Sequence, residues 1–240
     1  MTHQNDDGWT KSADAWITTL GDIGDQSRAY VLDQPMMARV RASGAKHLVD
    51  VGCGEGRFCR MARNAGLQTL GIDPTPALLE QARALDPVGT YLSAFGENLP
   101  LPDASTDLVV FYLSLIDIPD FPAAIAEAKR VLRPGGHILM GNLSGFFTAA
   151  RQTGWTVTKT NTADIHLRGY LENDVYWAEW NGIRVHNWHR PLTAYFQAFL
   201  YEGLILTHFD EPPSTHPDAA IRDQYNNTAY LMLSEWQKPA

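Results

Sequence analysis

The segment from His47 to Arg57, with the sequence HLVDVGCGEGR, constrains the fold of this chain more than any other. Its apolar half predicts a short buried strand, and three glycines separate that strand from a helical pattern that begins at Arg57. Glycines at such a junction let a ligand approach the bare backbone amides at the helix N-terminus. The segment therefore predicts a strand, a ligand-binding loop and a helix in succession.

A second apolar run ends at Asp73, which lies 21 residues after Gly52. In nucleotide-binding α/β sheets, an acidic residue at this distance hydrogen-bonds the hydroxyl groups of a ribose. The two features together predict an adenosyl cofactor. A dinucleotide loop of the form G-x-G-x-x-G would require glycine where Arg57 stands, so the spacing disfavours an NAD-linked reductase.

Strand and helix patterns alternate along the chain and predict an α/β fold of the doubly wound, Rossmann-like type, with a mostly parallel seven-stranded sheet. The expected strands are 47–51, 68–72, 89–94, 107–113, 137–142, 204–209 and 228–236. Helical segments are expected over 9–42, 56–65, 76–84, 121–132 and 191–202. We expect one domain over 1–240, made of an N-terminal helical cap (1–44), a cofactor-binding core (45–142), a substrate lid (143–190) and a C-terminal helix with edge strands (191–240).

The lid region contains a readable hairpin. Asn181-Gly182 favours a two-residue type I′ turn between the apolar runs 174–180 and 183–188. Pairing residue 180 with residue 183 places Glu179 opposite Arg184 and Trp177 opposite His186. The many aromatic residues of this hairpin suit a wall over a flat or apolar ligand.

Charge and composition exclude several classes of function. The formal net charge of −8 and the lack of a basic run disfavour nucleic acid and anionic membranes as partners. No apolar stretch is long enough to span a bilayer, and the polar N-terminus does not resemble a signal peptide. Cys53 and Cys59, the only cysteines, lack zinc spacing, so we expect free thiols in the cytoplasm and no metal. The sequence leaves the oligomeric state open, a homodimer included.

Five motifs in order resemble those of the class I S-adenosylmethionine-dependent methyltransferases. The segment 49–56 resembles the first motif of that family and Gly71-Ile72-Asp73 the second. The later matches are 94–102 with the loop after strand three, 106–110 with strand four, and 130–136 with the entry into strand five. The resemblance implies S-adenosylmethionine as the cofactor and methyl transfer as the reaction.

The resemblance also implies roles for individual residues. Asp50 would orient the glycine loop and meet the methionine amino group, while Gly52, Cys53 and Gly54 would approach the aminoacyl end. Asp73, with Pro74 beside it, would hold the ribose. The remaining cofactor contacts would come from Ala94 and Phe95 around the adenine, Leu113 near the amino group, and Arg28 or Tyr30 at the methionine carboxylate. Phe95 reads equally as a core residue, and Arg28 reads also as a surface ion-pair partner.

The acceptor site is less specified. Since methyl transfer depends mainly on alignment, a single base or none is required. His189, in a His-Arg-Pro pattern familiar from related enzymes, is a candidate general base, with a purely structural role at a helix start as the alternative. Asp117 is a weaker candidate, and N-capping before Pro119 is its alternative role. The expected pocket residues are Tyr30, Ser114, Tyr170, Trp177, His186 (for which a structural role is the alternative) and Trp188.

The interpretation that follows is a methyltransferase for a small, aromatic or apolar metabolite, acting at oxygen, nitrogen or carbon. No Asn-Pro-Pro-aromatic tetrad follows strand four, which disfavours exocyclic-amine DNA and protein-glutamine methylation. Methylation of another protein site or of RNA remains an alternative. A non-catalytic cofactor-binding module of the same fold is a second alternative.

Overall fold

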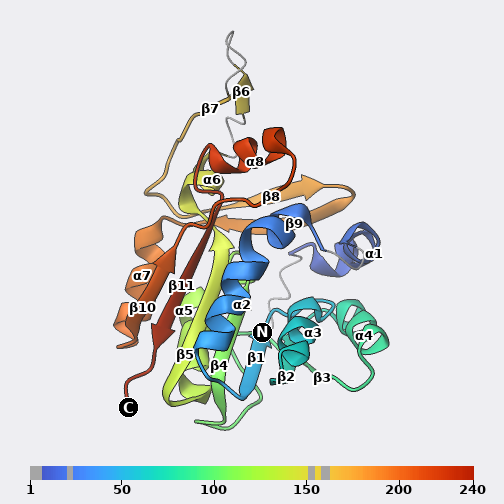
Figure 1. Ribbon diagram of the computed structural model, residues 1–240, viewed down its shortest axis with the longest axis vertical. Coiled ribbons are helices and arrows are strands. Elements are labelled where there is room, and N and C mark those ends of the chain that lie inside the picture. Colours follow the sequence, from blue (N-terminus) through green and yellow to red (C-terminus); the bar gives the residue numbers. More distant parts are fainter. Residues whose placement is uncertain (1–6, 21–23, 151–154, 158–162) are drawn as a thin grey trace.

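The computed structural model describes residues 7–20, 24–150, 155–157 and 163–240, and it contains the expected doubly wound sheet (Figure 1). The strand order is β10-β11-β5-β4-β1-β2-β3. The five central strands pair in parallel, and β11 and β10 add an antiparallel edge. Their bounds are β1 His47–Val51, β2 Gln68–Asp73, β3 Thr90–Ser93, β4 Thr106–Tyr112, β5 Leu132–Leu143, β10 Ile205–Asp210 and β11 Leu231–Gln237.

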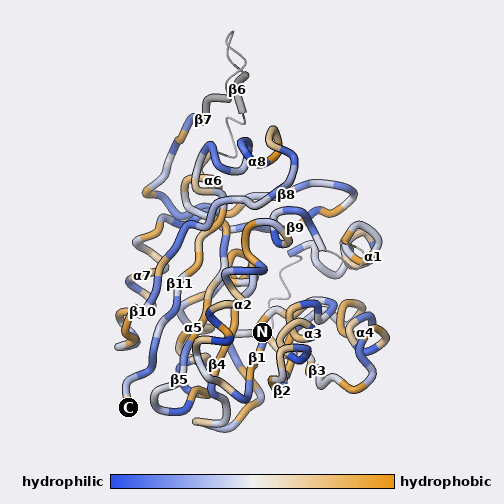
Figure 2. The backbone as a smooth tube through the Cα atoms, viewed as in Figure 1, coloured by the Kyte–Doolittle hydropathy of each residue, from blue (hydrophilic) through white to orange (hydrophobic). Residues whose placement is uncertain are grey.

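Alternate residues of the central strands feed two cores, one on each face of the sheet. Val49 and Val51 pack with the helices α5 (Phe121–Val131) and α7 (Leu192–Tyr201) on one face. Leu48 packs on the other face with α2 (Asp33–Ala42) and α3 (Arg57–Asn64). Figure 2 shows hydrophobic stretches along the central strands and the helices packed on them. Burial of both faces explains why the strands read as nearly continuous apolar runs.

The remaining elements surround the end of the sheet where the parallel strands finish (Figure 1). The hairpin of β8 (Asp174–Trp180) and β9 (Ile183–His189) has the expected register, with Trp180 opposite Ile183. It packs on α1 (Trp9–Leu20) through Ile183 and Val185, in a small core that also includes Leu78 of α4 (Pro76–Leu85). This packing holds the N-terminal helix beside the glycine loop.

Several boundaries differ from the expected ones. The segment 9–42 is not one helical run, because α1 ends at Leu20 and a short π-helix, η1 (Arg28–Leu32), precedes α2, while residues 21–23 lie outside the described part. Strand β5 begins at Leu132 rather than 137. The sequence patterns gave no sign of four short elements, which are α6 (Gly145–Ala149), β6 (Trp155–Val157), β7 (Ala163–Ile165) and α8 (Ala219–Asn226).

Candidate functional site

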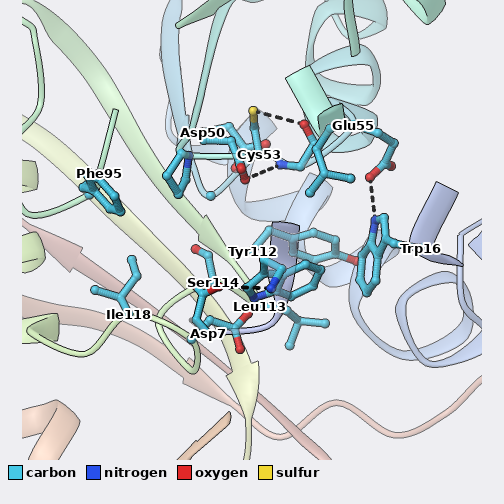
Figure 3. A pocket seen from close by; sticks show the side chains of 18 of the residues that line it. Asp7, Trp16, Asp50, Cys53, Glu55, Phe95, Tyr112, Leu113, Ser114 and Ile118 are labelled. Atoms are coloured by element: carbon cyan, nitrogen blue, oxygen red, sulfur yellow. Dashed lines mark hydrogen bonds between the residues drawn. The ribbon is translucent and has the colours of Figure 1, made fainter. Parts of the chain in front are cut away.

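A cleft of about 790 Å³ lies at the carboxyl ends of the parallel strands (Figure 3). This is where ligands bind in open α/β sheets. The loops after β1, β2, β3 and β4 form one side, and residues of the N-terminal helices form the other. The lining includes nine of the expected cofactor residues, which are Arg28, Asp50, Gly52, Cys53, Gly54, Asp73, Pro74, Phe95 and Leu113, together with Ser114 and Asp117 of the expected acceptor site.

The glycine loop is closed on one side and open on the other. A Cβ atom on Gly52, whose φ is +76°, would lie 2.3 Å from the Ser114 Cβ atom, so only glycine lets these two loops touch. A Cβ atom on Gly54, whose φ is +54°, would meet nothing within 4 Å. The Gly54 backbone therefore borders open cleft space, as close approach of a ligand requires.

Asp50 is buried at the base of the cleft and holds an unsatisfied oxygen atom. Its Oδ2 atom accepts a weak hydrogen bond from the Cys59 thiol at 3.6 Å, but its Oδ1 atom has no hydrogen-bond partner among the described residues. Burial, and then the charges of Asp73 and Glu55, raise the pKa of Asp50 to about 7, against the weaker opposing effect of Cys59. An ammonium group of a ligand would satisfy this oxygen and draw the carboxyl into its charged form.

Asp73 joins the second strand to the glycine loop. Its Oδ2 atom accepts a hydrogen bond from the Gly54 backbone N–H at 2.9 Å, and its Oδ1 atom accepts one from Thr75 at 2.8 Å. Burial raises the pKa of Asp73 despite these hydrogen bonds. Each carboxylate oxygen has a further lone pair, so the residue can bind ribose hydroxyls while it fixes the loop.

Of the two residues expected at the adenine, one lines the cleft and the other does not. Phe95 lines the cleft and is 61% exposed, so it is not a core residue. Ala94 packs against the core on the α5 side and is absent from the cleft lining. Gly96 and Glu97 line the cleft in its place.

The N-terminal wall brings Trp16, to which the sequence patterns gave no role, beside Arg28 in the cleft. The Trp16 indole N–H donates to the Glu55 Oε2 atom at 3.0 Å, and the Arg28 guanidinium lies 4.8 Å from the Trp16 ring centroid. Arg28 also forms an ion pair with Asp25 at 3.2 Å. Arg28 thus lines the cleft and also makes an ion pair, although its side chain is mostly buried rather than on the surface.

Asp117 is a carboxyl of the cleft wall. The Asn187 amide of β9 donates to its Oδ1 atom at 2.5 Å. Burial, above all, raises the pKa of Asp117 well above its usual range, and the charge of Asp7 acts in the same direction. The alternative expectation of an N-cap is wrong, because Asp120 caps α5 by accepting a hydrogen bond from the Ala123 N–H at 3.1 Å.

His189 lies outside the cleft. The side chain is buried, with Nδ1 at 2.6 Å from the Thr148 hydroxyl oxygen and Nε2 at 3.1 Å from the Tyr170 carbonyl oxygen. These contacts connect the end of β9 to α6 and to the segment before β8. His189 therefore does not line the described cleft, and these contacts join it to α6 and to Tyr170 rather than to the start of α7.

The other expected aromatic residues do not line the cleft either. Trp177 lies between the Arg184 guanidinium, 3.7 Å from its ring centroid, and the His186 ring at 3.8 Å. Tyr170 stacks on Phe146, Tyr30 contacts His216, and Trp188 contacts Arg190. Because the apolar face of β9 packs on α1, the hairpin turns Trp177, His186 and Trp188 away from the cleft. The aromatic wall comes instead from Trp9, Trp16 and Tyr112.

The buried Arg190 holds the loop after β4. Its guanidinium donates to the carbonyl oxygens of Leu115 and Ile118, both at 2.7 Å, and of Pro119 at 3.1 Å. The backbone N–H of Trp188 also donates to the Ile116 carbonyl at 2.8 Å. The His-Arg-Pro pattern therefore shapes the site indirectly, by fixing the loop that carries Ser114 and Asp117.

Two searches of the described residues bear on the remaining classes of function. No group of three or more His, Cys, Asp or Glu side chains is arranged to hold a metal ion there. None of the described helices has the length and apolar character needed to cross a membrane. Cys53 and Cys59 are buried free thiols.

Comparison with known proteins agrees with this geometry. Residues 49–140 match the family model described as a methyltransferase domain. A malonyl-[acyl-carrier protein] O-methyltransferase from Serratia marcescens is 38% identical over 125 residues, which are 50% of this chain and 49% of that protein. The alignment thus spans about half the length of this curated relative.

Solved structures extend the similarity to nearly the whole chain. An S-adenosylmethionine dependent methyltransferase from Mesorhizobium loti is 25% identical, with a TM-score of 0.75 over 91% of this chain and 100% of that one. The [4+2]-cyclase SpnF, 20% identical with a TM-score of 0.57 over 87% of this chain and 81% of that one, shares the fold although its name gives a different reaction. The fold alone therefore does not define the reaction. The matched segment, the motifs and the sheet together show that this chain contains a methyltransferase domain and has the fold of S-adenosylmethionine dependent methyltransferases.

Proposed function

We propose that this chain binds S-adenosylmethionine in the described cleft and transfers its methyl group to a small molecule. The observation that carries the proposal is the unsatisfied Asp50 Oδ1 atom beside the open backbone of Gly54. A buried carboxylate oxygen without a donor is costly, and its retention at the base of a cleft is explained by a cationic group of a ligand. The amino group of the methionine moiety is such a group.

The other cleft residues fit the rest of this cofactor. Arg28 is placed to bind the methionine carboxylate, Asp73 to bind the ribose hydroxyls, and Phe95 with Gly96 to contact the adenine. When bound, the cofactor supplies an electrophilic methyl group on a sulfonium. The task of the chain is then to hold both reactants in line and to exclude water, which can account for an effective molarity on the order of 10⁵–10⁸ M.

The cleft favours a small acceptor over a macromolecule. Its volume of about 790 Å³ lies in the range of small-ligand pockets. The net charge of −8 disfavours RNA. Methylation of a protein or of RNA is the runner-up, and transfer of label from radiolabelled cofactor into a macromolecular fraction would establish it.

The proposal is tested by titration calorimetry with S-adenosylmethionine and S-adenosylhomocysteine. We expect saturable binding with a Kd well below about 1 mM, and weaker binding to the Asp73→Ala variant, because this variant loses both the ribose contact and the bond that fixes Gly54. The Asp103→Asn variant, whose side chain is 79% exposed on the surface, serves as the control with unchanged affinity. Absence of binding at this level would overturn the proposal.

A further inference from the structure

The described cleft is markedly acidic. Seven of its lining residues carry a carboxyl group, and three carry a basic group. Of these three, Arg57 is held by Asp33 through both ends of its guanidinium, and Arg28 pairs with Asp25. The third is Lys11 of α1, a single ammonium group in a lining that carries seven carboxyl groups. In the proposed complex Arg28 also receives the methionine carboxylate. The part of the cleft left for the acceptor is therefore dominated by carboxyl groups.

Two of these carboxyl groups lie beyond the cofactor contacts. Asp117 is held by Asn187 at 2.5 Å, in a buried environment near the charge of Asp7. Figure 3 shows Asp7 below Ser114 and Leu113, opposite the glycine loop. A cation that enters between these walls would offset their mutual repulsion.

The opposite wall contains a second unsatisfied oxygen. Glu55 is only 5% exposed, and its Oε1 atom has no hydrogen-bond partner among the described residues, whereas Oε2 accepts the Trp16 indole N–H. A buried acceptor of this kind requires a donor from a ligand or from water. The unsatisfied Glu55 oxygen is thus independent of the number of charges in the cleft, and it too favours a ligand that donates hydrogen bonds.

The aromatic lining suits a cation as well. Trp9 and Trp16 form an edge-to-face pair with ring centroids 4.9 Å apart, and both line the cleft. Trp16 already accommodates the Arg28 guanidinium over its ring. Indole faces attract ammonium groups when water is excluded.

From these features we infer that the methyl acceptor is an amine, which enters the cleft as an ammonium ion and is held by Asp117 beside the indole wall. The inference rests on the proposed function and specifies its substrate class. An anionic acceptor, such as a carboxylate or a phenolate, would meet carboxyl groups and find no comparable set of donors.

The chemistry of such a step balances. The ammonium nitrogen gives one proton to the Asp117 carboxylate, which becomes a carboxylic acid. The freed nitrogen lone pair forms the new N–CH₃ bond while the bond between the methyl carbon and sulfur breaks. The electron pair of the broken C–S bond stays on sulfur, which becomes a neutral thioether. Burial favours the neutral acid form of Asp117, which is consistent with its raised pKa. The methylated ammonium product then leaves.

The test compares three probes of similar size, 2-phenylethylamine, 2-phenylethanol and phenylacetate, on protein saturated with S-adenosylhomocysteine. We expect titration calorimetry to give an amine affinity at least about tenfold higher than that of phenylacetate and higher than that of the alcohol. Repeating the amine titration in buffers of different ionisation enthalpy should show proton release, because the cation draws Asp117 into its charged form. Tighter binding of phenylacetate or of the alcohol, or no amine binding, overturns the inference.

Matched variants separate this inference from the proposed function. Asp117→Asn keeps the size of the side chain and its ability to accept from Asn187, so we expect amine affinity to fall about tenfold while S-adenosylhomocysteine affinity stays within about twofold. Asp103→Asn is the surface control. Unchanged amine affinity in Asp117→Asn would contradict the inference alone, and the proton release of the unmodified protein tests it independently of any variant. Loss of S-adenosylhomocysteine binding in the unmodified protein would instead contradict the proposed function.

Discussion

At the scale of single residues, Asp50 combines a cost in stability with the role in binding that we propose. Its buried carboxyl has an oxygen atom that no described residue satisfies, and burial raises its pKa to about 7. Residues that weaken the folded state in this way are retained when a ligand uses them. Asp50 could be identified from the sequence, because the first motif places it, but its missing partner appears only once the neighbouring loops are folded.

The raised pKa of Asp50 gives a pH dependence with a definite sign. Between about pH 4 and pH 7 the native carboxyl keeps a proton that the unfolded chain has released, so its contribution to stability is lost as pH rises through this window. Relative to the Asp50→Asn variant, the unmodified ligand-free protein should lose as much as about 4 kcal/mol of unfolding free energy between pH 4 and pH 8. Denaturant unfolding at several pH values measures this difference.

Asp107 provides a control for which the change of stability with pH has the opposite sign. Partial burial acts to raise its pKa, but hydrogen bonds from the His47 and Lys46 backbone and from Arg133 outweigh it and lower the pKa. The stability that ionised Asp107 contributes to the folded state is present above the ordinary aspartate pKa and is lost as pH falls. Relative to Asp107→Asn, the unmodified protein should therefore gain stability as pH rises from about 2 to 5. Parallel stability curves for Asp50→Asn and the unmodified protein would contradict the assignment of Asp50.

At the scale of elements, the hairpin shows what periodicity predicts and what it leaves open. The Asn-Gly turn predicted the register of β8 and β9 correctly. Along β9, the buried positions are Ile183, Val185, Asn187 and His189, which share one face. That period of two was a signal in the sequence for an inward Asn187 and for outward His186 and Trp188. The partner of the buried face, α1, could not be predicted because the contact joins segments far apart in the chain.

Arg190 fixes the loop after β4, and its removal should be costly. Arg190→Ala leaves three buried carbonyl groups without their donor, so we expect a loss of about 3 kcal/mol or more. For a chain of 240 residues this corresponds to a Tm lower by about 6–12 °C. Scanning calorimetry measures the shift, and faster amide exchange over 114–119 would locate it.

Arg184→Ala, on the strand β9 that ends just before Arg190, is the matched control. Its guanidinium pairs with Glu179 in an exposed position, where such pairs contribute little. We expect its Tm to stay within about 2 °C of the unmodified protein. Equal effects of the two substitutions would contradict the role given to Arg190.

His189 precedes Arg190 in the His-Arg-Pro pattern, and its substitution tests whether this pattern has a structural role. Since its ring nitrogens contact Thr148 and Tyr170 rather than the cleft, His189→Asn should lower stability without changing the pH profile of methyl transfer. A general base would instead contribute a limb near pH 6.5. Disappearance of such a limb in the variant, with Tm unchanged, would restore the catalytic interpretation.

At the scale of the whole molecule, the sequence predicted the sheet and most of the residues that line the cleft, including Ser114 and Asp117, but not the N-terminal wall. The central strands, the glycine loop and Asp73 are local features that recur in a fixed order, so the motifs locate them. The wall made by Trp9, Trp16 and Asp7 depends on how the N-terminal segment returns over the sheet, which is a tertiary property. The sequence patterns predicted the aromatic wall on the hairpin instead, because composition does not show which face of a strand a ring occupies.

Binding at this cleft should stabilise the whole chain, because it joins the N-terminal helices to the sheet. At a ligand concentration of 100 times Kd, S-adenosylhomocysteine should add about 2.7 kcal/mol to the free energy of unfolding and raise Tm by about 5–11 °C. Thermal unfolding at increasing ligand concentration measures this shift. A Tm that does not respond to the ligand at any concentration would contradict binding to the folded state.

The most direct test of the central claim, that the glycine loop and Asp50 hold S-adenosylmethionine in this cleft, is a crystal structure with S-adenosylhomocysteine bound. We expect the ligand amino group within about 3–3.5 Å of the Asp50 Oδ1 atom, the ribose on Asp73, and the sulfur facing the loop that carries Ser114 and Asp117. A ligand bound elsewhere, or one that leaves the Asp50 Oδ1 atom without a partner, would contradict the claim.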